Sequence, residues 1–404
     1  MAQSLTSADR FVIDPIPHLA SVTAALWVPY GSRHEGGDLR GGSHLLEHVV
    51  TASESAFGDN CFRRVTALGG RTDAVTTPEF TVYAMTVPHT AWKEAWQLLE
   101  SQFDTPDFSD SVVETQKLMV VDEIAGAESD AGRHIHAVAL SEMLSGHGLG
   151  YPAVGRSDDI GERTPQDLRD VHRRQLHAAP RAIVSGNVDS ADAADLLGAS
   201  PLFAAEQAFA PPISPPPERP HARAGFEKTT VGSTRSHVLV SWFLPDRTPA
   251  DDLPLALVNR LAGGAAGGSL QRVLHRSEGA YSSHTYRSVF SDCAVWSAYL
   301  SCSAQFTEAA AERIIRAIEQ AWDTAMNDGE ARQHASLALA GALAIGLEST
   351  RMRVNWIGRR LQDRMEIPEH LGSPTEGALV SGDALLALRE RLVGPHVTIF
   401  EGKR

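Results

Sequence analysis

The residues best suited to chemistry are two histidines and a glutamate in the run His44-Leu-Leu-Glu-His48. The segment from about Gly42 to Val50 is apolar and follows a Gly-Gly pair, which favours a helix. Residues four apart lie on one face of a helix, so both imidazoles can reach one ion while Glu47 lies beside them. Nitrogen donors, often with a carboxylate, and one open position for water are typical of catalytic zinc. We therefore predict a zinc centre in which Glu47 takes a proton from water.

A third protein ligand is required, and the residues alone leave three options. Glu123 and its neighbour Asp122 belong to Val120-Val-Asp-Glu-Ile124, within a predicted helix that is otherwise apolar. A buried carboxylate is costly unless it is paired or binds a metal, which makes both residues candidates. His134 and His136, two apart near a predicted loop, are the third option. Glu123 is the first candidate, although the spacing alone does not choose between it and Asp122, and we interpret the two histidines as ordinary surface residues.

The elements that must position these residues occur twice along the chain. Leu19 to Pro29 predicts a strand, followed by a polar loop and the helix from about Gly42. His237 to Pro245 predicts a second strand, followed by a polar loop and a helix from about Pro254. This order is what a duplicated α/β unit would leave.

A proline-rich run, Ala210 to Pro220, lies between the two copies and is unsuited to the interior of a helix or sheet. We predict a zinc-binding catalytic lobe over residues 1–204, a linker over 205–224, and a homologous lobe without zinc over 225–404, serving substrate binding or dimerisation.

Further elements follow from hydrophobic periodicity and residue propensity. The predicted strands are Thr81 to Val87 and Ala182 to Val188, and the predicted helices are Ala91 to Phe103, Ser109 to Ala125, Glu308 to Met326 and Glu330 to Leu347. Apolar residues are so dense in the helix from Ser109 that we predict it to be largely buried.

Length and composition limit the class of protein. A chain of 404 residues suits two domains, and 43% hydrophobic with 21% charged residues is typical of a soluble globular protein. A net charge of −14 disfavours nucleic acid and anionic membranes as partners. The three cysteines are too few and scattered for a disulfide framework and suit a reducing compartment. With no signal peptide or membrane-length apolar run evident, we expect a cytoplasmic protein.

Motifs of other enzyme classes are missing from the sequence. No GxSxG is present, and the glycine-rich run Gly263 to Gly268 is not followed by the Lys-Ser or Lys-Thr of a phosphate-binding loop.

Several short motifs extend the pattern over nearly the whole chain. They are Gly31-Ser-Arg-His-Glu35, His44-Leu-Leu-Glu-His48, Gly69-Gly-Arg-Thr-Asp-Ala74 with Thr76, His147-Gly-Leu-Gly-Tyr-Pro152, Gly279-Ala-Tyr-Ser282 and Leu347-Glu-Ser-Thr350. In this order they resemble the GSRxE, HxxEH, GGxxNAxT, HPLGxP, GLAYS and LEST segments of the peptidase family that includes pitrilysin, insulysin and the mitochondrial processing peptidase. The likeness is to its short, two-domain members.

The resemblance implies one zinc ion per chain, held by His44, His48 and Glu123, with Glu47 as the catalytic base. It implies an α+β fold of two homologous lobes, each a mixed or antiparallel sheet with helices packed on one face, forming half of a clamshell. It also implies a zinc-dependent endopeptidase of short or unfolded peptides, which add as a strand to the sheet edge Arg71 to Thr77.

The same resemblance assigns substrate contacts and marks departures from the family pattern. Asp73 and Ala74 lie on the substrate edge, where the family commonly has asparagine in place of Asp73. Gln116 stands where a second glutamate is common. In the second lobe Tyr281 matches a substrate-gripping tyrosine, but the segment before it is one residue short, so that either His275 or Arg276 stands at the place of the family's arginine.

An intact HxxEH beside an altered gripping segment is what the zinc-bearing subunit of a heterodimer would carry. We therefore expect a homologous second subunit rather than a homodimer, and a role in processing precursor peptides is compatible with this expectation. The alternative is a non-catalytic assembly or peptide-binding subunit that retains the peptidase fold.

Overall fold

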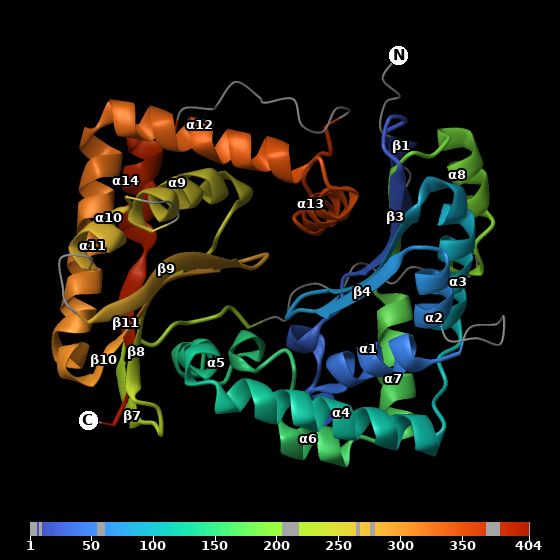
Figure 1. The fold of residues 1–404 in the computed structure, drawn as a ribbon, viewed down its shortest axis with the longest axis horizontal. Coiled ribbons are helices and arrows are strands. Elements are labelled where there is room, and N and C mark those ends of the chain that lie inside the picture. The colour runs from blue at the N-terminus through green and yellow to red at the C-terminus, as the bar shows by residue number, and fades with distance from the viewer. Residues whose placement is uncertain are drawn as a thin grey trace. The chain divides into compact units, whose positions relative to one another are not determined.

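The computed structural model of the chain describes residues 6–7, 10–54, 61–203, 218–263, 267–274, 279–368 and 380–403. Two compact units are present, each built on one sheet (Figure 1). The first unit comprises Met1–Ala125, Pro152–Pro217 and Ile345–Ser373, and the second comprises Gly126–Tyr151, Glu218–Ala344 and Pro374–Arg404. Each unit therefore contains segments from both halves of the sequence.

The sheet of the first unit has six strands in the order β1-β2-β6-β3-β5-β4. They are β1 (Thr6–Ser7), β2 (Phe11–Pro15), β3 (Ser21–Val28), β4 (Arg71–Thr76), β5 (Thr81–Pro88) and β6 (Arg181–Gly186). Strands β2 and β6 are parallel, whereas the other neighbours are antiparallel. Strand β4, which covers most of the predicted substrate edge, has β5 as its one neighbour among the described residues and so forms an edge of the sheet.

The sheet of the second unit has five strands in the order β7-β11-β8-β10-β9. They are β7 (Phe226–Thr230), β8 (Arg235–Leu244), β9 (Ala280–Val289), β10 (Ala294–Ser303) and β11 (Val393–Glu401). Its one parallel pair is β7 with β11, and the other neighbours are antiparallel. Apart from β1, strand order and directions repeat those of the first unit, which confirms the predicted α+β fold of two homologous lobes with mixed sheets.

The helices of the two units are α1 (Gly42–Ala52), α2 (Cys61–Ala67), α3 (Trp92–Asp104), α4 (Asp110–Ser129), α5 (Ala131–Met143), α6 (Ser157–Glu162), α7 (Pro165–His177), α8 (Ser190–Gly198), α9 (Asp252–Ala262), α10 (Ser269–Leu274), α11 (Thr307–Asn327), α12 (Gly329–Gly346), α13 (Thr350–Gln362) and α14 (Gly382–Arg391). Of these helices, α1, α3, α4, α9, α11 and α12 lie close to predicted ranges, and no range was predicted for the others. Within the described parts of the chain, none of these helices combines the length and apolarity that a membrane crossing requires.

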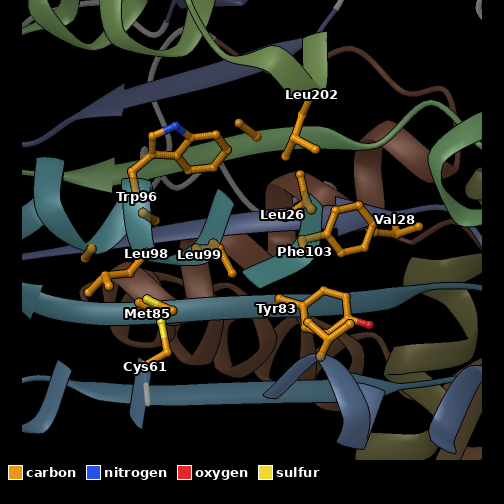
Figure 2. Packing of buried hydrophobic residues seen from close by; sticks show 14 of the residues in the cluster. Leu26, Val28, Cys61, Tyr83, Met85, Trp96, Leu98, Leu99, Phe103 and Leu202 are labelled. Atoms are coloured by element: carbon orange, nitrogen blue, oxygen red, sulfur yellow. The ribbon is translucent and has the colours of Figure 1, made fainter. Parts of the chain in front are cut away.

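The main core of the first unit lies between one face of its sheet and helices that include α1, α3 and α8. Alternate residues of β3 face this core, among them Leu26 and Val28, because side chains of a strand alternate between the two faces. Figure 2 shows Leu26, Tyr83, Phe103 and Trp96 packed together there. Leu45 and Leu46 of α1 belong to the same cluster, which holds the helix with the two histidines in the core of this unit.

The opposite face of the first sheet is covered by α13, which comes from the second half of the sequence. Val354 and Ile357 of α13 pack on a smaller cluster that includes Ala25 and Trp27 of β3. The helix approaches so closely at Gly358 that a Cβ atom there would lie 2.1 Å from the indole of Trp27. The helices are therefore not confined to one face of this sheet.

The second unit shows the reciprocal arrangement. Ile135 and Ala139 of α5, from the first half of the sequence, pack on Leu239, Tyr299 and Phe400 of the second sheet. The predicted domains are contiguous, at 1–204 and 225–404, whereas the compact units exchange these helices, because an amphipathic helix does not reveal in its sequence which sheet it covers. Most of the predicted linker, residues 205–217, lies outside the described residues.

The prediction that the helix from Ser109 is largely buried is wrong. In α4 the buried residues are Val113, Gln116, Val120 and Ile124, which form one stripe. Leu118 and Met119 are 74% and 55% exposed. The apolar residues of α4 are spread around the helix, but only one side of the helix meets the core.

Candidate metal centre

The helix that carries the two histidines begins at a tightly held turn. Gly41, at its N-terminus, has a φ of 77°, a left-handed conformation that glycine adopts without the steric cost of a side chain. The carboxylate of Glu35 accepts hydrogen bonds from the backbone N–H of Gly41 at 2.7 Å and of Ser43 at 2.6 Å. These two groups have no partner inside the helix, so Glu35 anchors the start of α1.

His44 and His48 lie one turn apart on α1, and their rings meet edge to face with centroids 4.8 Å apart. The Nδ1 atom of His44 lies 3.1 Å from the carbonyl oxygen of Val154, which holds the ring and leaves Nε2 available. Burial, followed by the neighbouring His48, lowers the pKa of His44. A neutral ring with one nitrogen fixed by a carbonyl is the form in which histidine binds metals.

Glu123 of α4 approaches both rings. Its Oε2 atom lies 3.5 Å from Nε2 of His48 and 3.9 Å from Nε2 of His44. The three residues offer ligand atoms that all lie within 4.8 Å of one another. Tetrahedral bonds of about 2.0–2.2 Å to zinc would place ligand atoms about 3.4 Å apart, so this donor set fits the predicted ion with small side-chain adjustments.

The other candidates for a third ligand lie elsewhere. Asp122 and Glu123 are both exposed, so the expectation of a buried carboxylate is wrong, but only Glu123 belongs to the converging group. His134 and His136 are on helix α5 in the second unit, rather than near a loop as predicted. His134 packs against the ring of Phe400, and Nδ1 of His136 lies 2.6 Å from the Tyr286 hydroxyl. Among the residues that the structure describes, His44, His48 and Glu123 are the one group with this geometry.

Glu47 lies on α1 beside the histidines and is 9% exposed. Its Oε2 atom accepts a hydrogen bond of 2.5 Å from the hydroxyl of Thr76, the last residue of β4. Burial raises the pKa of Glu47 to about 7, and the charges of Glu123 and Asp73 add to this effect, whereas Thr76 opposes it. A divalent cation bound next to the carboxylate would favour its ionised form. The residue is thus a buried carboxylate beside the candidate metal ligands, with a hydroxyl donor on one of its oxygens.

The predicted substrate contacts are distributed over both units. Asp73 and Ala74 lie on β4, and Asp73 is half-exposed with its Oδ2 atom 2.7 Å from the guanidinium of Arg351 of α13. In the second unit Tyr281 is 57% exposed on β9, with the guanidinium of Arg235 4.3 Å from the centre of its ring.

The remaining predicted positions are Gln116, His275 and Arg276. Gln116 is buried in the stripe of α4 that faces the core. His275 and Arg276, the two candidates for the place of the gripping arginine, lie outside the described residues.

Three supporting residues were not identified from the sequence as parts of the site. Val154 contributes a backbone carbonyl, which leaves no mark in a sequence. Glu35 and Thr76 belong to the motifs noted above, but only the folded chain brings their side chains to the start of α1 and to Glu47. For Glu35 and Thr76, membership of these motifs was the available signal.

Two protein-family models match consecutive parts of the chain. Residues 10–155 match the model described as "Insulinase (Peptidase family M16)", and residues 163–335 match "Peptidase M16 inactive domain". The chain belongs to peptidase family M16. The first matched segment contains the HxxEH run, and the second does not.

M16 relatives in bacteria and mitochondria are similar along most of the chain. A protein named an uncharacterized zinc protease from Streptomyces coelicolor is 26% identical, with 87% of this chain and 78% of that protein aligned. Another of that description from Bacillus subtilis is 24% identical, over 87% of this chain and 85% of that protein. The mitochondrial-processing peptidase subunit beta of Blastocladiella emersonii is 22% identical, over 70% of this chain and 63% of its own length.

Solved structures share the fold. A peptidase M16 inactive domain from Pseudomonas fluorescens superposes with a TM-score of 0.84 at 15% identity, covering 99% of this chain and 97% of that one. A protease from Helicobacter pylori gives a TM-score of 0.82 at 15% identity, with both chains fully covered. At this identity the likeness concerns the fold alone.

Proposed function

We propose that the chain is a zinc-dependent endopeptidase that cleaves short or unfolded peptides. The observation that carries this proposal is the convergence of His44, His48 and Glu123, with Glu47 on the same helix beside them. Membership of family M16 and relatives named zinc proteases support it. In this proposal the first unit is the catalytic lobe with one zinc, and the second unit serves substrate binding or association.

The roles of the residues follow from their chemistry. Zinc, when bound by His44, His48 and Glu123, supplies a Lewis acid that lowers the pKa of water and polarises a peptide carbonyl. Glu47 takes a proton from the attacking water and passes it to the leaving amine. Val154 holds the ring of His44 in the orientation that ligation requires.

The substrate is proposed to pair with the open edge of β4. This edge bears Asp73 and Ala74, and main-chain hydrogen bonds to an edge strand accept many peptide sequences. Only an extended segment can add in this way, which favours short or unfolded peptides over folded proteins. Tyr281, exposed on β9, is the proposed contact in the second unit.

A homologous second subunit is part of the proposal. Relatives include chains named as subunits, the beta subunit of a processing peptidase and subunit 1 of the mouse cytochrome b-c1 complex. The b-c1 relative also supports the alternative, a non-catalytic assembly or peptide-binding subunit with this fold. The retained residues His44, Glu47 and His48 favour catalysis. Three free, buried cysteines support a cytoplasmic location, and precursor-peptide processing is the proposed biological role.

The test is peptide cleavage by the purified chain, alone and with a co-expressed homologue that lacks HxxEH. We expect cleavage of unfolded peptides that depends on Glu47, with strong stimulation by the partner. Full activity of the chain alone would refute the heterodimer, and cleavage by Glu47→Gln equal to wild type would refute the assigned catalytic role. Absence of cleavage in every combination would favour the non-catalytic alternative.

A further inference from the structure

We propose that Thr76 is a positioning residue for Glu47, and that its hydroxyl determines which carboxylate oxygen faces the attacking water. The inference rests on the proposed peptidase function. The Oγ1 atom of Thr76 donates to Oε2 of Glu47 over 2.5 Å. Among the described residues, Thr76 is the only one whose side chain hydrogen bonds this carboxylate.

The direction of the Thr76 side chain follows from the alternation of the edge strand. Thr72, Ala74 and Thr76 are half-buried, whereas the residues between them are exposed. Side chains two apart lie on one face of a strand, so Thr72 and Thr76 share a face. Only Thr76, at the end of β4, makes a hydrogen bond to Glu47 of α1.

The turn that follows Thr76 is rigidly held by hydrogen bonds. The backbone N–H and the hydroxyl of Thr77 both donate to the carbonyl of Phe80, at 2.9 and 2.8 Å. The N–H of Ser32 donates to the carbonyl of Thr77 at 3.2 Å. The end of β4 is thereby fixed to the loop that leads towards α1.

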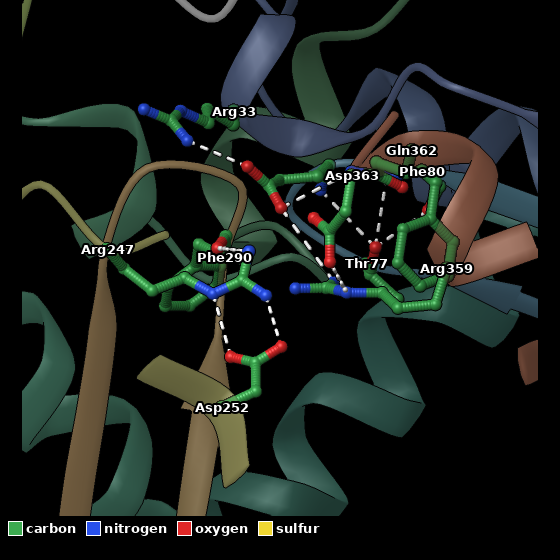
Figure 3. Close-up of polar contacts among 10 residues, drawn as sticks. Arg33, Thr77, Phe80, Arg247, Asp252, Phe290, Arg359, Gln362 and Asp363 are labelled. Carbon is green, nitrogen blue, oxygen red and sulfur yellow. Dashed lines mark hydrogen bonds and ion pairs between the residues drawn. The ribbon is translucent and has the colours of Figure 1, made fainter. Parts of the chain in front are cut away.

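A buried ion-pair network strengthens the same turn (Figure 3). Glu79 accepts a hydrogen bond of 2.8 Å from Arg33, and its other oxygen accepts one of 3.3 Å from Gln362 of α13. Arg359 of α13 lies 3.9 Å from Glu79 and 3.6 Å from Asp363. The turn after Thr76 is therefore held both by Arg33 and by helix α13. A hydroxyl on such a rigid support is already oriented towards Glu47 before substrate binds.

The consequence concerns the two oxygens of the Glu47 carboxylate. With Oε2 engaged by Thr76, Oε1 is the oxygen that accepts the proton from water and returns it to the leaving amine, while the hydroxyl of Thr76 remains a donor throughout. Rotation about the terminal torsion of glutamate is otherwise nearly free. Without the hydroxyl, the carboxylate spends less time in the productive orientation, and we expect about a tenfold or greater loss of kcat.

The experiment compares Thr76→Val, which keeps the shape and removes the hydroxyl, with Thr76→Ser, which retains the hydroxyl. Thr72→Val, on the same face of the same strand, is the matched control. For each we would measure kcat, KM, zinc content and the midpoint of unfolding. We expect Thr76→Val to lose kcat about tenfold or more with KM, zinc and midpoint unchanged, whereas Thr76→Ser and Thr72→Val stay near wild type.

Two results would overturn the inference while leaving the proposed function intact. One is a kcat of Thr76→Val close to that of the active wild type. The other is an equal loss in Thr76→Ser and Thr76→Val, which would assign the effect to packing of the strand. A wild type that binds zinc but cleaves nothing, either alone or with the co-expressed homologue, would instead refute the proposed function, and this inference with it.

Discussion

Substitution of Arg353 by methionine tests how the second half of the chain is attached to the first sheet. Arg353 lies on α13 and forms a two-pronged ion pair with Asp14 of β2, Nε to Oδ2 at 2.5 Å and Nη2 to Oδ1 at 2.7 Å. The two residues are 9% and 4% exposed. The hydroxyl of Ser185 donates a further hydrogen bond of 2.7 Å to Asp14, and Nη1 of Arg353 donates to the carbonyl of Leu347.

The magnitude follows from what Arg353→Met leaves behind. The carboxylate of Asp14 would remain buried with Ser185 as its surviving side-chain donor. Removal of one partner of a buried ion pair costs about 3–5 kcal/mol, whereas neutralising both partners is much less costly. We therefore expect Arg353→Met to lower the free energy of unfolding by about 3–5 kcal/mol, and Asp14→Asn combined with Arg353→Met to recover at least about half of that loss.

Urea unfolding followed by tryptophan fluorescence is the assay, because Trp27 and Trp356 both belong to the cluster around α13. The control is Arg351→Met, which breaks the more exposed pair with Asp73 and should cost no more than about 1 kcal/mol. The reasoning is refuted if Arg353→Met is as stable as Arg351→Met, or if the double variant is no more stable than Arg353→Met alone.

Further predictions concern packing and pH. Gly358→Ala would force a methyl group into the indole of Trp27 and should destabilise the chain by about 1–3 kcal/mol. Gly341→Ala is the control: a Cβ atom at this position of α12 would have no neighbour within 4 Å, so the variant should be neutral or slightly stabilising. Equal thermal midpoints of the two variants would contradict this. Burial lowers the pKa of His136 to about 4, below about 6.5 for an unfolded histidine. Between about pH 4 and 6.5 this histidine binds more protons in the unfolded chain than in the folded one. Its contribution to the free energy of unfolding is therefore fully present above about pH 6.5 and is lost as the pH drops towards 4. His136→Gln should lessen that fall by about 1–2 kcal/mol, after allowance for the exposed part of the ring, and an unchanged pH slope in urea unfolding would contradict it.

The local elements were readable from the sequence because they depend on periodicity. Helix α1, strand β3 and strand β8 lie close to their predicted ranges, since apolar residues spaced for a buried face leave few alternatives. The placement of His44, Glu47 and His48 on one helix followed from the same reasoning. The duplicated sheet order agrees with the repeated pattern of strand, loop and helix on either side of the proline-rich run.

What the sequence did not reveal is which distant segments meet. The run Leu347-Glu-Ser-Thr350 was noted as a motif, but its physical basis appears only in the fold: the Ser349 side chain caps α13, and the Thr350 hydroxyl lies 2.7 Å from that of Thr23. The carbonyl of Val154 beside His44 could not be predicted either, since a backbone group has no residue type. The exposure of Leu118 shows the same limit, because composition does not tell how many sides of a helix are covered.

The central claim is a zinc ion held by His44, His48 and Glu123, and the zinc content of the purified chain tests it most directly. Elemental analysis of protein prepared without chelator should find about one zinc per chain, retained in Glu47→Gln and lost in His44→Ala and His48→Ala. Wild-type protein that contains no zinc and takes none up, or a His48→Ala variant that holds as much zinc as the wild type, would contradict the account.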